Sequence, residues 1–149
     1  MFLEEFKKIV ETEAVNSFWE SRAQGKLRNH AEKHGQQILG VFAHAKLAGR
    51  GLAIRAAVSG TGFVDFIVTF SGGLPHVVEL KILKDRKISG VGQLATYMAQ
   101  KNRDEGWLVF FDARKPHQRT AIPSSFKRKA GTIRSIVVDI NPIAPHARS

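Results

Sequence analysis

The chain has 149 residues, 43% of them hydrophobic, which suits one folded domain with a core of its own. It contains no cysteine, so disulfides, thiolate metal sites and cysteine nucleophiles are excluded. Lys and Arg number 23 against 13 acidic residues, and the net charge of +10 favours a polyanionic partner, most often nucleic acid, over a role in solubility alone.

The N-terminal segment does not resemble a secretory signal, because acidic residues interrupt its apolar positions. No apolar run approaches the roughly 20 residues that a helix needs to cross a bilayer. We therefore expect a cytoplasmic protein without a membrane partner.

Apolar spacing predicts two helices at the start of the chain, over residues 2–19 and 27–47. The pattern then changes to strands over 52–58, 63–70 and 74–83, with Ser71-Gly72-Gly73 as a tight turn between the last two. A helix over 90–103, with Ser89 as its candidate cap, precedes strands over 106–112 and 132–140. This order predicts one α/β domain with a mixed central sheet flanked by helices. We divide it into an N-terminal helical extension (1–24), a core (25–140) and a tail (141–149).

Charged residues interrupt two of the predicted strands. Because strand side chains alternate between faces, Glu79 and Lys81 share one face of strand 74–83 and their apolar neighbours point to the other. A three-residue turn pairs Phe70 with Leu74, and this register sets Asp65 opposite Glu79, with Cβ atoms about 4.5–5.5 Å apart. A slip of one residue would move Asp65 to the other face.

Two carboxylates in this position repel each other, and a hard divalent cation such as Mg²⁺ between them relieves the repulsion. Lys81 would then reach a metal-bound water or a phosphate. The alternative interpretation is a solvated sheet face, on which Lys81 neutralises one carboxylate in an ion pair of little energetic weight.

The pattern of Asp65 on one strand and E-L-K at 79–81 on the next, between two helices, resembles the signature of the PD-(D/E)XK nuclease superfamily. Val64 stands in place of the proline of that signature, which is the part most often lost. The Q-x₃-Y sequence at 93–97 resembles the helix element of the RecB-like branch. The resemblance covers residues 27–112 and implies a restriction-endonuclease-like fold with an α-β-β-β-α-β core.

The resemblance also implies a metal-dependent nuclease that hydrolyses phosphodiester bonds with Mg²⁺ or Mn²⁺. Catalysis would use Asp65, Glu79, Lys81 and Gln93. The metal would be held by Asp65, Glu79, the backbone carbonyl of Leu80 and Glu32. Separately from the resemblance, the basic stretch of Lys127, Arg128 and Lys129 is a candidate for contact with nucleic acid, together with Lys84 and Tyr97.

Several alternatives stay open. Glu32 also fits a solvated helix face, Gln93 and Tyr97 fit a helix that only packs on the core, and His30, His34 and His44 invite a zinc interpretation. DNA is expected before RNA, but an RNA- or tRNA-cleaving toxin domain and a non-catalytic nucleic-acid-binding module are alternatives. Further candidate partners are a second copy of the chain, an immunity protein and an ATPase. The N-terminal helix would form the dimer or pack on the sheet.

Overall fold

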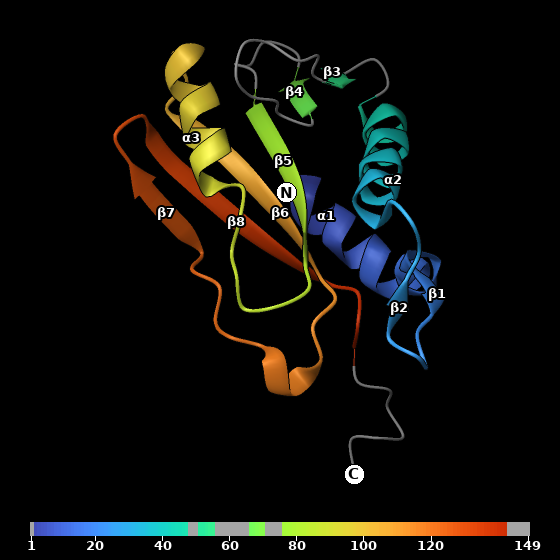
Figure 1. Ribbon diagram of the computed structural model, residues 1–149. Coiled ribbons are helices and arrows are strands. Elements are labelled where there is room, and N and C mark those ends of the chain that lie inside the picture. Colours follow the sequence, from blue (N-terminus) through green and yellow to red (C-terminus); the bar gives the residue numbers. More distant parts are fainter. Residues whose placement is uncertain (1, 48–50, 56–65, 71–75, 143–149) are drawn as a thin grey trace.

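The protein has a mixed α/β fold, seen in a computed structural model (Figure 1). The structure describes residues 2–47, 51–55, 66–70 and 76–142, the two short middle ranges by their backbone alone. Its main sheet has the strand order β3-β4-β5-β6-β8-β7. The bounds of these strands are β3 (Gly51–Arg55), β4 (Phe66–Phe70), β5 (His76–Leu83), β6 (Glu105–Asp112), β7 (Ser125–Arg128) and β8 (Gly131–Asp139).

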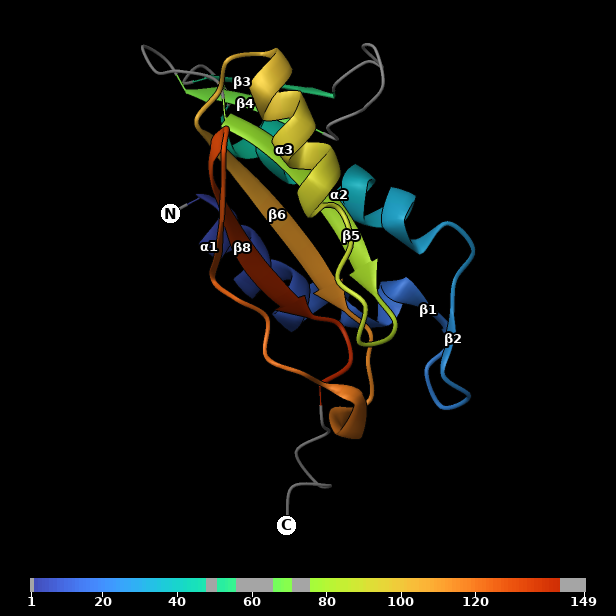
Figure 2. The same ribbon diagram turned by 60° about the vertical axis from the view of Figure 1, so that its left-hand side comes forward.

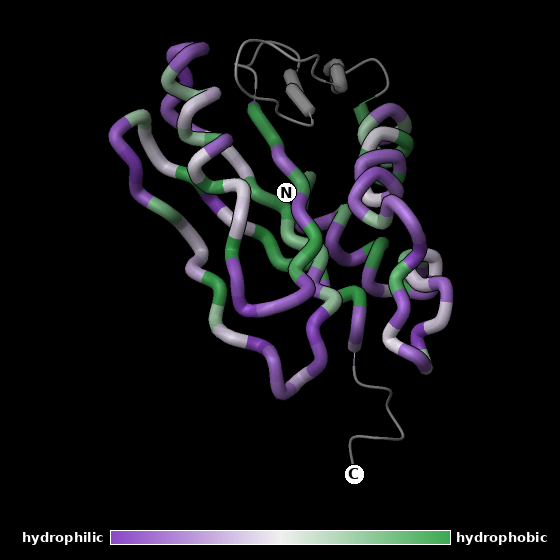
Figure 3. Tube along the Cα trace, in the orientation of Figure 1, coloured by the Kyte–Doolittle hydropathy of each residue, from purple (hydrophilic) through white to green (hydrophobic). Residues whose placement is uncertain are grey.

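The centre of the sheet is parallel and its edges are antiparallel. β5 pairs with β6 and β6 with β8 in parallel, whereas β3, β4 and β7 join their neighbours in antiparallel pairs. A parallel centre must be covered on both faces, which explains the nearly continuous apolar run of β6. Figure 3 shows the hydrophobic residues concentrated along these central strands, whereas the helices alternate between hydrophobic and hydrophilic residues.

Helices cover both faces of the sheet. α1 (Phe2–Ile9) and α2 (Ala31–Lys46) lie on one face, and α3 (Val91–Gln100) lies on the other (Figure 2). The first face buries Phe6, Leu39 and Phe111 in one apolar cluster, and the second buries Leu94, Met98 and Phe110 in another. α1 therefore packs on the sheet, which was one of the two alternatives predicted for the N-terminal helix.

The segment between α1 and α2 differs from the prediction. The helical spacing continues to residue 19, but the chain passes through a π-helical turn (Val10–Ala14) and a 3₁₀ turn (Val15–Phe18). It then forms a short antiparallel hairpin of β1 (Trp19–Ser21) and β2 (Lys26–Leu27). As a result α2 begins at Ala31 rather than at residue 27. This hairpin lies beside the N-terminal end of α2.

The predicted order of one helix, three strands, a helix and a strand is present as α2-β3-β4-β5-α3-β6. β7 was not predicted, because its four residues include one apolar side chain, Phe126. The prediction that Ser89 caps α3 is wrong. Gly90 takes the cap position with a φ of 96°, a left-handed conformation that suits glycine, and no side chain caps the helix.

The predicted hairpin register is confirmed where the structure describes it. That register sets Phe66 opposite Val78 and Val68 opposite His76, and both pairs are observed between β4 and β5. Asp65 and the turn at 71–73 lie outside the described residues, so the pairing of Asp65 with Glu79 stays a prediction. Across the described ranges, no helix has the length and apolar character to cross a membrane.

α2 approaches the sheet closely at Gly35, and this contact yields a stability prediction. A Cβ at Gly35 would lie 2.5 Å from Phe111 Cε2, whereas one at Gly92 in α3 would meet nothing within 4 Å. Gly35→Ala should lower the free energy of unfolding by about 1–3 kcal/mol through overpacking. Gly92→Ala should leave it unchanged or raise it by about 0.5 kcal/mol, since alanine favours helix. Urea unfolding measures both, and equal effects of the two substitutions would contradict the close approach.

Candidate active site

β5 carries two charged residues on the face that α3 covers. Glu79 is 4% exposed, and its apolar neighbours Val78 and Leu80 belong to the cluster on the opposite face. The Lys81 side chain, 24% exposed, runs beneath the start of α3. There a Cβ on Gly90 would lie 3.1 Å from Lys81 Cγ, closer than an ordinary van der Waals contact, so the start of α3 lies directly against the lysine stem. The predicted alternation of faces is therefore present in β5.

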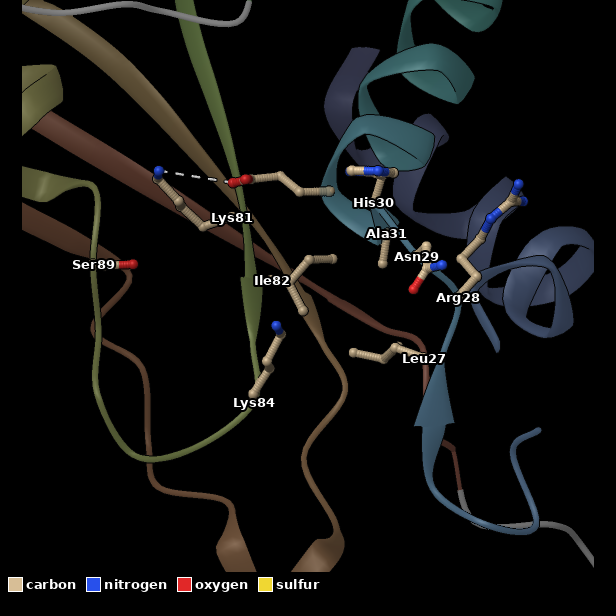
Figure 4. A pocket seen from close by; sticks show the side chains of 10 residues that line it. Leu27, Arg28, Asn29, His30, Ala31, Lys81, Ile82, Lys84 and Ser89 are labelled. Atoms are coloured by element: carbon tan, nitrogen blue, oxygen red, sulfur yellow. Dashed lines mark ion pairs between the residues drawn. The ribbon is translucent and has the colours of Figure 1, made fainter. Parts of the chain in front are cut away.

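Glu32 brings a second carboxylate to the same ammonium group. It lies in the first turn of α2, and its Oε1 is 3.7 Å from Lys81 Nζ, the ion pair drawn in Figure 4. Glu79 Oε1 is 3.9 Å from the same nitrogen. Both separations exceed ordinary hydrogen-bond lengths, so Lys81 sits between two carboxylates without a tight bond to either. Glu32, Glu79 and Lys81 are hereafter the acid–lysine cluster.

A cavity of about 530 Å³ opens beside this cluster. It lies between the N-terminal end of α2 and the C-terminal half of β5, and its lining includes Glu32, Lys81, Lys84 and Arg28 (Figure 4). Its volume falls within the roughly 300–1,000 Å³ typical of ligand sites. Three basic side chains against one acidic one make its described lining suited to an anion.

Arg28 is held at the cavity by His34 on α2. Arg28 Nη1 is 3.1 Å from His34 Nδ1, and His34 Nε2 is 2.8 Å from the Ser17 hydroxyl oxygen. Arg28 can only donate, so Nδ1 accepts and Nε2 carries the proton. The His34 ring also packs edge-on against Phe18, at 5.0 Å between centroids. These contacts give His34 a structural role and position the guanidinium of Arg28.

The other residues that the sequence singled out are spread over the structure. Gln93 is exposed in the first turn of α3, three residues after the glycine that contacts Lys81, and its catalytic role stays a prediction. Tyr97 is 5% exposed within the α3 cluster, which favours a packing role over the predicted contact with nucleic acid. The Leu80 side chain is buried, and its carbonyl's role as a ligand stays a prediction.

The basic residues divide into two groups. Lys84 lines the cavity beside the acid–lysine cluster. Lys127, Arg128 and Lys129 are exposed at β7 and just after it, three strand positions away from β5. At about 4.8 Å per strand this is roughly 14 Å across the sheet. The predicted nucleic-acid contacts at 127–129 therefore belong to a different edge of the molecule from the cavity.

The metal predictions depend on the carboxylates. Within the described ranges, no group of three or more His, Asp or Glu side chains is placed to hold an ion. The zinc interpretation of His30, His34 and His44 gains nothing from this arrangement, since His34 is engaged by Arg28 and Ser17. Glu32 and Glu79 are the two candidate ligands that the structure brings together, and Asp65 lies outside the described residues.

A buried charge network at the carboxyl ends of β6 and β8 was not predicted from the sequence. Asp112, 3% exposed, accepts two hydrogen bonds from the Arg114 guanidinium, at 2.9 and 3.0 Å. The Arg119 guanidinium likewise donates two hydrogen bonds to the Asp139 carboxylate, a bidentate pair. Burial would raise the pKa of Asp139, but hydrogen bonds from Arg119 and the Asn141 amide hold it below its ordinary value. The sequence feature that could have predicted this network is the D-x-R spacing at 112–114, because it places both side chains on one side of an extended chain.

A comparison with protein families finds one match, which spans most of the chain. A family model described as a domain of unknown function, DUF8371, matches residues 1–115. The chain belongs to this family. The DUF8371 match includes the acid–lysine cluster and its cavity, and it ends before β7 and the basic residues at 127–129. Neither the curated proteins nor the solved structures gave a match to the chain.

His34 makes the stability of this DUF8371 protein depend on pH. Burial, and secondarily the neighbouring Arg28 cation, lower the pKa of His34 from its ordinary value of 6.5. Below pH 6.5 His34 is protonated in the unfolded chain but still neutral in the folded protein. The free energy of unfolding therefore falls as the pH drops from about 6.5 toward the lowered pKa of His34 in the folded state. We expect the melting temperature to decline over this window and His34→Gln to reduce the decline. If the melting temperature declined equally with pH in the wild type and in His34→Gln, His34 would not be the source of the pH dependence.

Proposed function

We propose that this protein is a metal-dependent nuclease whose chemistry resides in the acid–lysine cluster. The observation that carries the proposal is the convergence of Glu32 and Glu79, from a helix and a strand far apart in sequence, on the ammonium of Lys81. A purely structural ion pair needs one carboxylate per lysine. A second carboxylate beside the same ammonium supplies a further hard oxygen ligand, of the kind that a divalent cation requires.

The chemistry of these donors fits Mg²⁺ or Mn²⁺. Such hard cations prefer carboxylate oxygens, and Mg²⁺ is commonly held by one or two carboxylates with water and substrate phosphate in the remaining positions. Glu32 and Glu79 would supply that pair, with Asp65 as the third carboxylate that the sequence predicts. When bound, the ion would lower the pKa of a coordinated water and offset charge on the phosphate.

Lys81 supplies the second part of the proposed mechanism. Its stem lies directly beneath Gly90, its side chain lines the cavity, and its ammonium group is within 4 Å of both carboxylates. A cation fixed in this way stabilises the negative charge that grows on the phosphate oxygens during hydrolysis. Lys84 and Arg28, on the same cavity wall, would bind phosphates on either side of the scissile bond.

The fold supports the same proposal at a coarser level. The order α2-β3-β4-β5-α3-β6 agrees with the core of restriction-endonuclease-like nucleases, with the E-x-K sequence on β5 and the Q-x₃-Y sequence on α3. We propose this fold assignment together with the activity. DNA is the preferred substrate by analogy with that superfamily. The alternative is an RNA- or tRNA-cleaving domain, so RNA is tested as a second substrate.

Lys81→Met is the sharpest single test, because methionine keeps most of the stem beneath Gly90 and removes the charge. We expect Mg²⁺-dependent cleavage to fall by about 10²–10³-fold, the loss typical of removing one group that stabilises transition-state charge. Nucleic-acid binding should fall by about threefold or less, since one charge among many is lost. The matched control is Lys101→Met, an exposed lysine after α3, which should keep wild-type cleavage.

The assay incubates plasmid, single-stranded DNA and tRNA with Mg²⁺, Mn²⁺ or EDTA. Glu79→Gln should abolish cleavage, and Glu32→Gln should raise the Mg²⁺ concentration needed for half-maximal rate. Wild-type activity in Glu79→Gln or Lys81→Met would end the nuclease proposal. Binding that resists EDTA, with no product from any substrate, would instead favour a non-catalytic binding module.

A further inference from the structure

A second cavity, of about 240 Å³, adjoins the first. Leu27 and Lys84 line both cavities, so the two are neighbours. Figure 4 shows Leu27 coming from β2 and Lys84 from the segment after β5. The second cavity lies where β5 and β6 end, and Lys115 and Gln118 from the loop after β6 complete one side.

The charge of this second cavity is positive. Its described lining contains Lys84 and Lys115 and no acidic side chain. Lys115 is exposed, and so is Arg28 in the first cavity. A chain of phosphates that passes the acid–lysine cluster would therefore meet one cation after another from Arg28 to Lys84 to Lys115.

The second cavity also contains an aromatic ring. Trp19 lines it, and the indole N–H donates to the Ile140 carbonyl at 2.8 Å, which fixes the ring in place. Asn141, which also lines this cavity, is held by hydrogen bonds with Arg22 and Asp139. At about 240 Å³ the space suits one planar group rather than a whole drug-sized ligand, which needs roughly 300–1,000 Å³.

We propose that the second cavity receives an unpaired base of the substrate, stacked on Trp19, while Lys84 and Lys115 hold the adjoining phosphates. A basic groove with an aromatic platform is the arrangement that binds single strands, because every base offers a flat face for stacking. A paired base within a duplex is already stacked on its neighbours and hydrogen-bonded to its partner. The inference rests on the proposed nuclease function, and it assigns that enzyme a single-stranded or locally unpaired substrate.

Trp19 fluorescence tests the stacking directly. The chain has two tryptophans, so Trp107→Phe leaves Trp19 as the sole reporter. In EDTA, which prevents metal-dependent cleavage, oligothymidylate or oligouridylate of about 12 nucleotides should quench Trp19, and a blunt duplex of equal length should not. Binding by both without quenching would overturn the proposal.

Substitutions at Trp19 provide an independent readout. Trp19→Leu should weaken single-strand binding by about fivefold or more, the size of effect expected from loss of one stacked base. Trp19→Phe loses the same hydrogen bond to Ile140 but keeps an aromatic ring, and it should restore most of the affinity. Equal weakening by both substitutions would assign Trp19 a structural role and contradict the stacking.

Matched charge removals test the path of the phosphates. Lys84→Ala with Lys115→Ala should weaken single-strand binding by about tenfold or more, whereas Lys127→Ala with Arg128→Ala removes the same charge at β7 and should cost about threefold or less. Equal losses of affinity in the two double variants would contradict the proposed path of the phosphates along Lys84 and Lys115. Cleavage without Trp19 quenching would refute this inference and leave the nuclease intact, whereas quenching without cleavage would support it and refute the nuclease.

Discussion

The structure around the proposed site depends on one arrangement of charges: a lysine ammonium within 4 Å of two glutamate carboxylates, beside a central strand of a mixed sheet. Three charged groups so close together carry a large desolvation cost unless water, a cation or an anionic ligand shares the space. The adjoining cavity, which Glu32 and Lys81 line, provides that access. The proposed binding and catalytic role rests on this cluster.

Two close backbone approaches hold this arrangement in position. Gly35 lets α2 lie directly against Phe111, which fixes the helix whose first turn carries Glu32. Gly90 lets the start of α3 lie directly on the stem of Lys81. Glu32 thus comes from a helix packed closely on the sheet, and Lys81 comes from a strand of the sheet whose side chain lies against the start of α3. Such preorganisation is what electrostatic stabilisation of a transition state requires.

Much of this was predictable from the sequence. The change from helical to strand periodicity gave the order of the core elements, and the alternation along β5 placed Glu79 and Lys81 on one face. The wrong helix boundary has a physical cause: helical spacing continues through Trp19, but the chain turns into a hairpin there. Tyr97 forms an apolar stripe with Leu94 and Met98, which agrees with the packing alternative, and its contact with nucleic acid stays a prediction. The second cavity joins residues from β1, from after β5 and from after β6, and periodicity carries no information on such contacts.

The central claim is that Glu32 and Glu79 hold a divalent cation beside Lys81, and direct titration of Mn²⁺ into the protein tests it without any assumption about substrate. Calorimetry or the electron paramagnetic resonance signal of free Mn²⁺ gives the number of bound ions and their affinity. The account predicts saturable binding by the wild type, weaker binding by Glu32→Gln and none by Glu79→Gln. Binding of equal strength in all three proteins, or no binding in any, would contradict it.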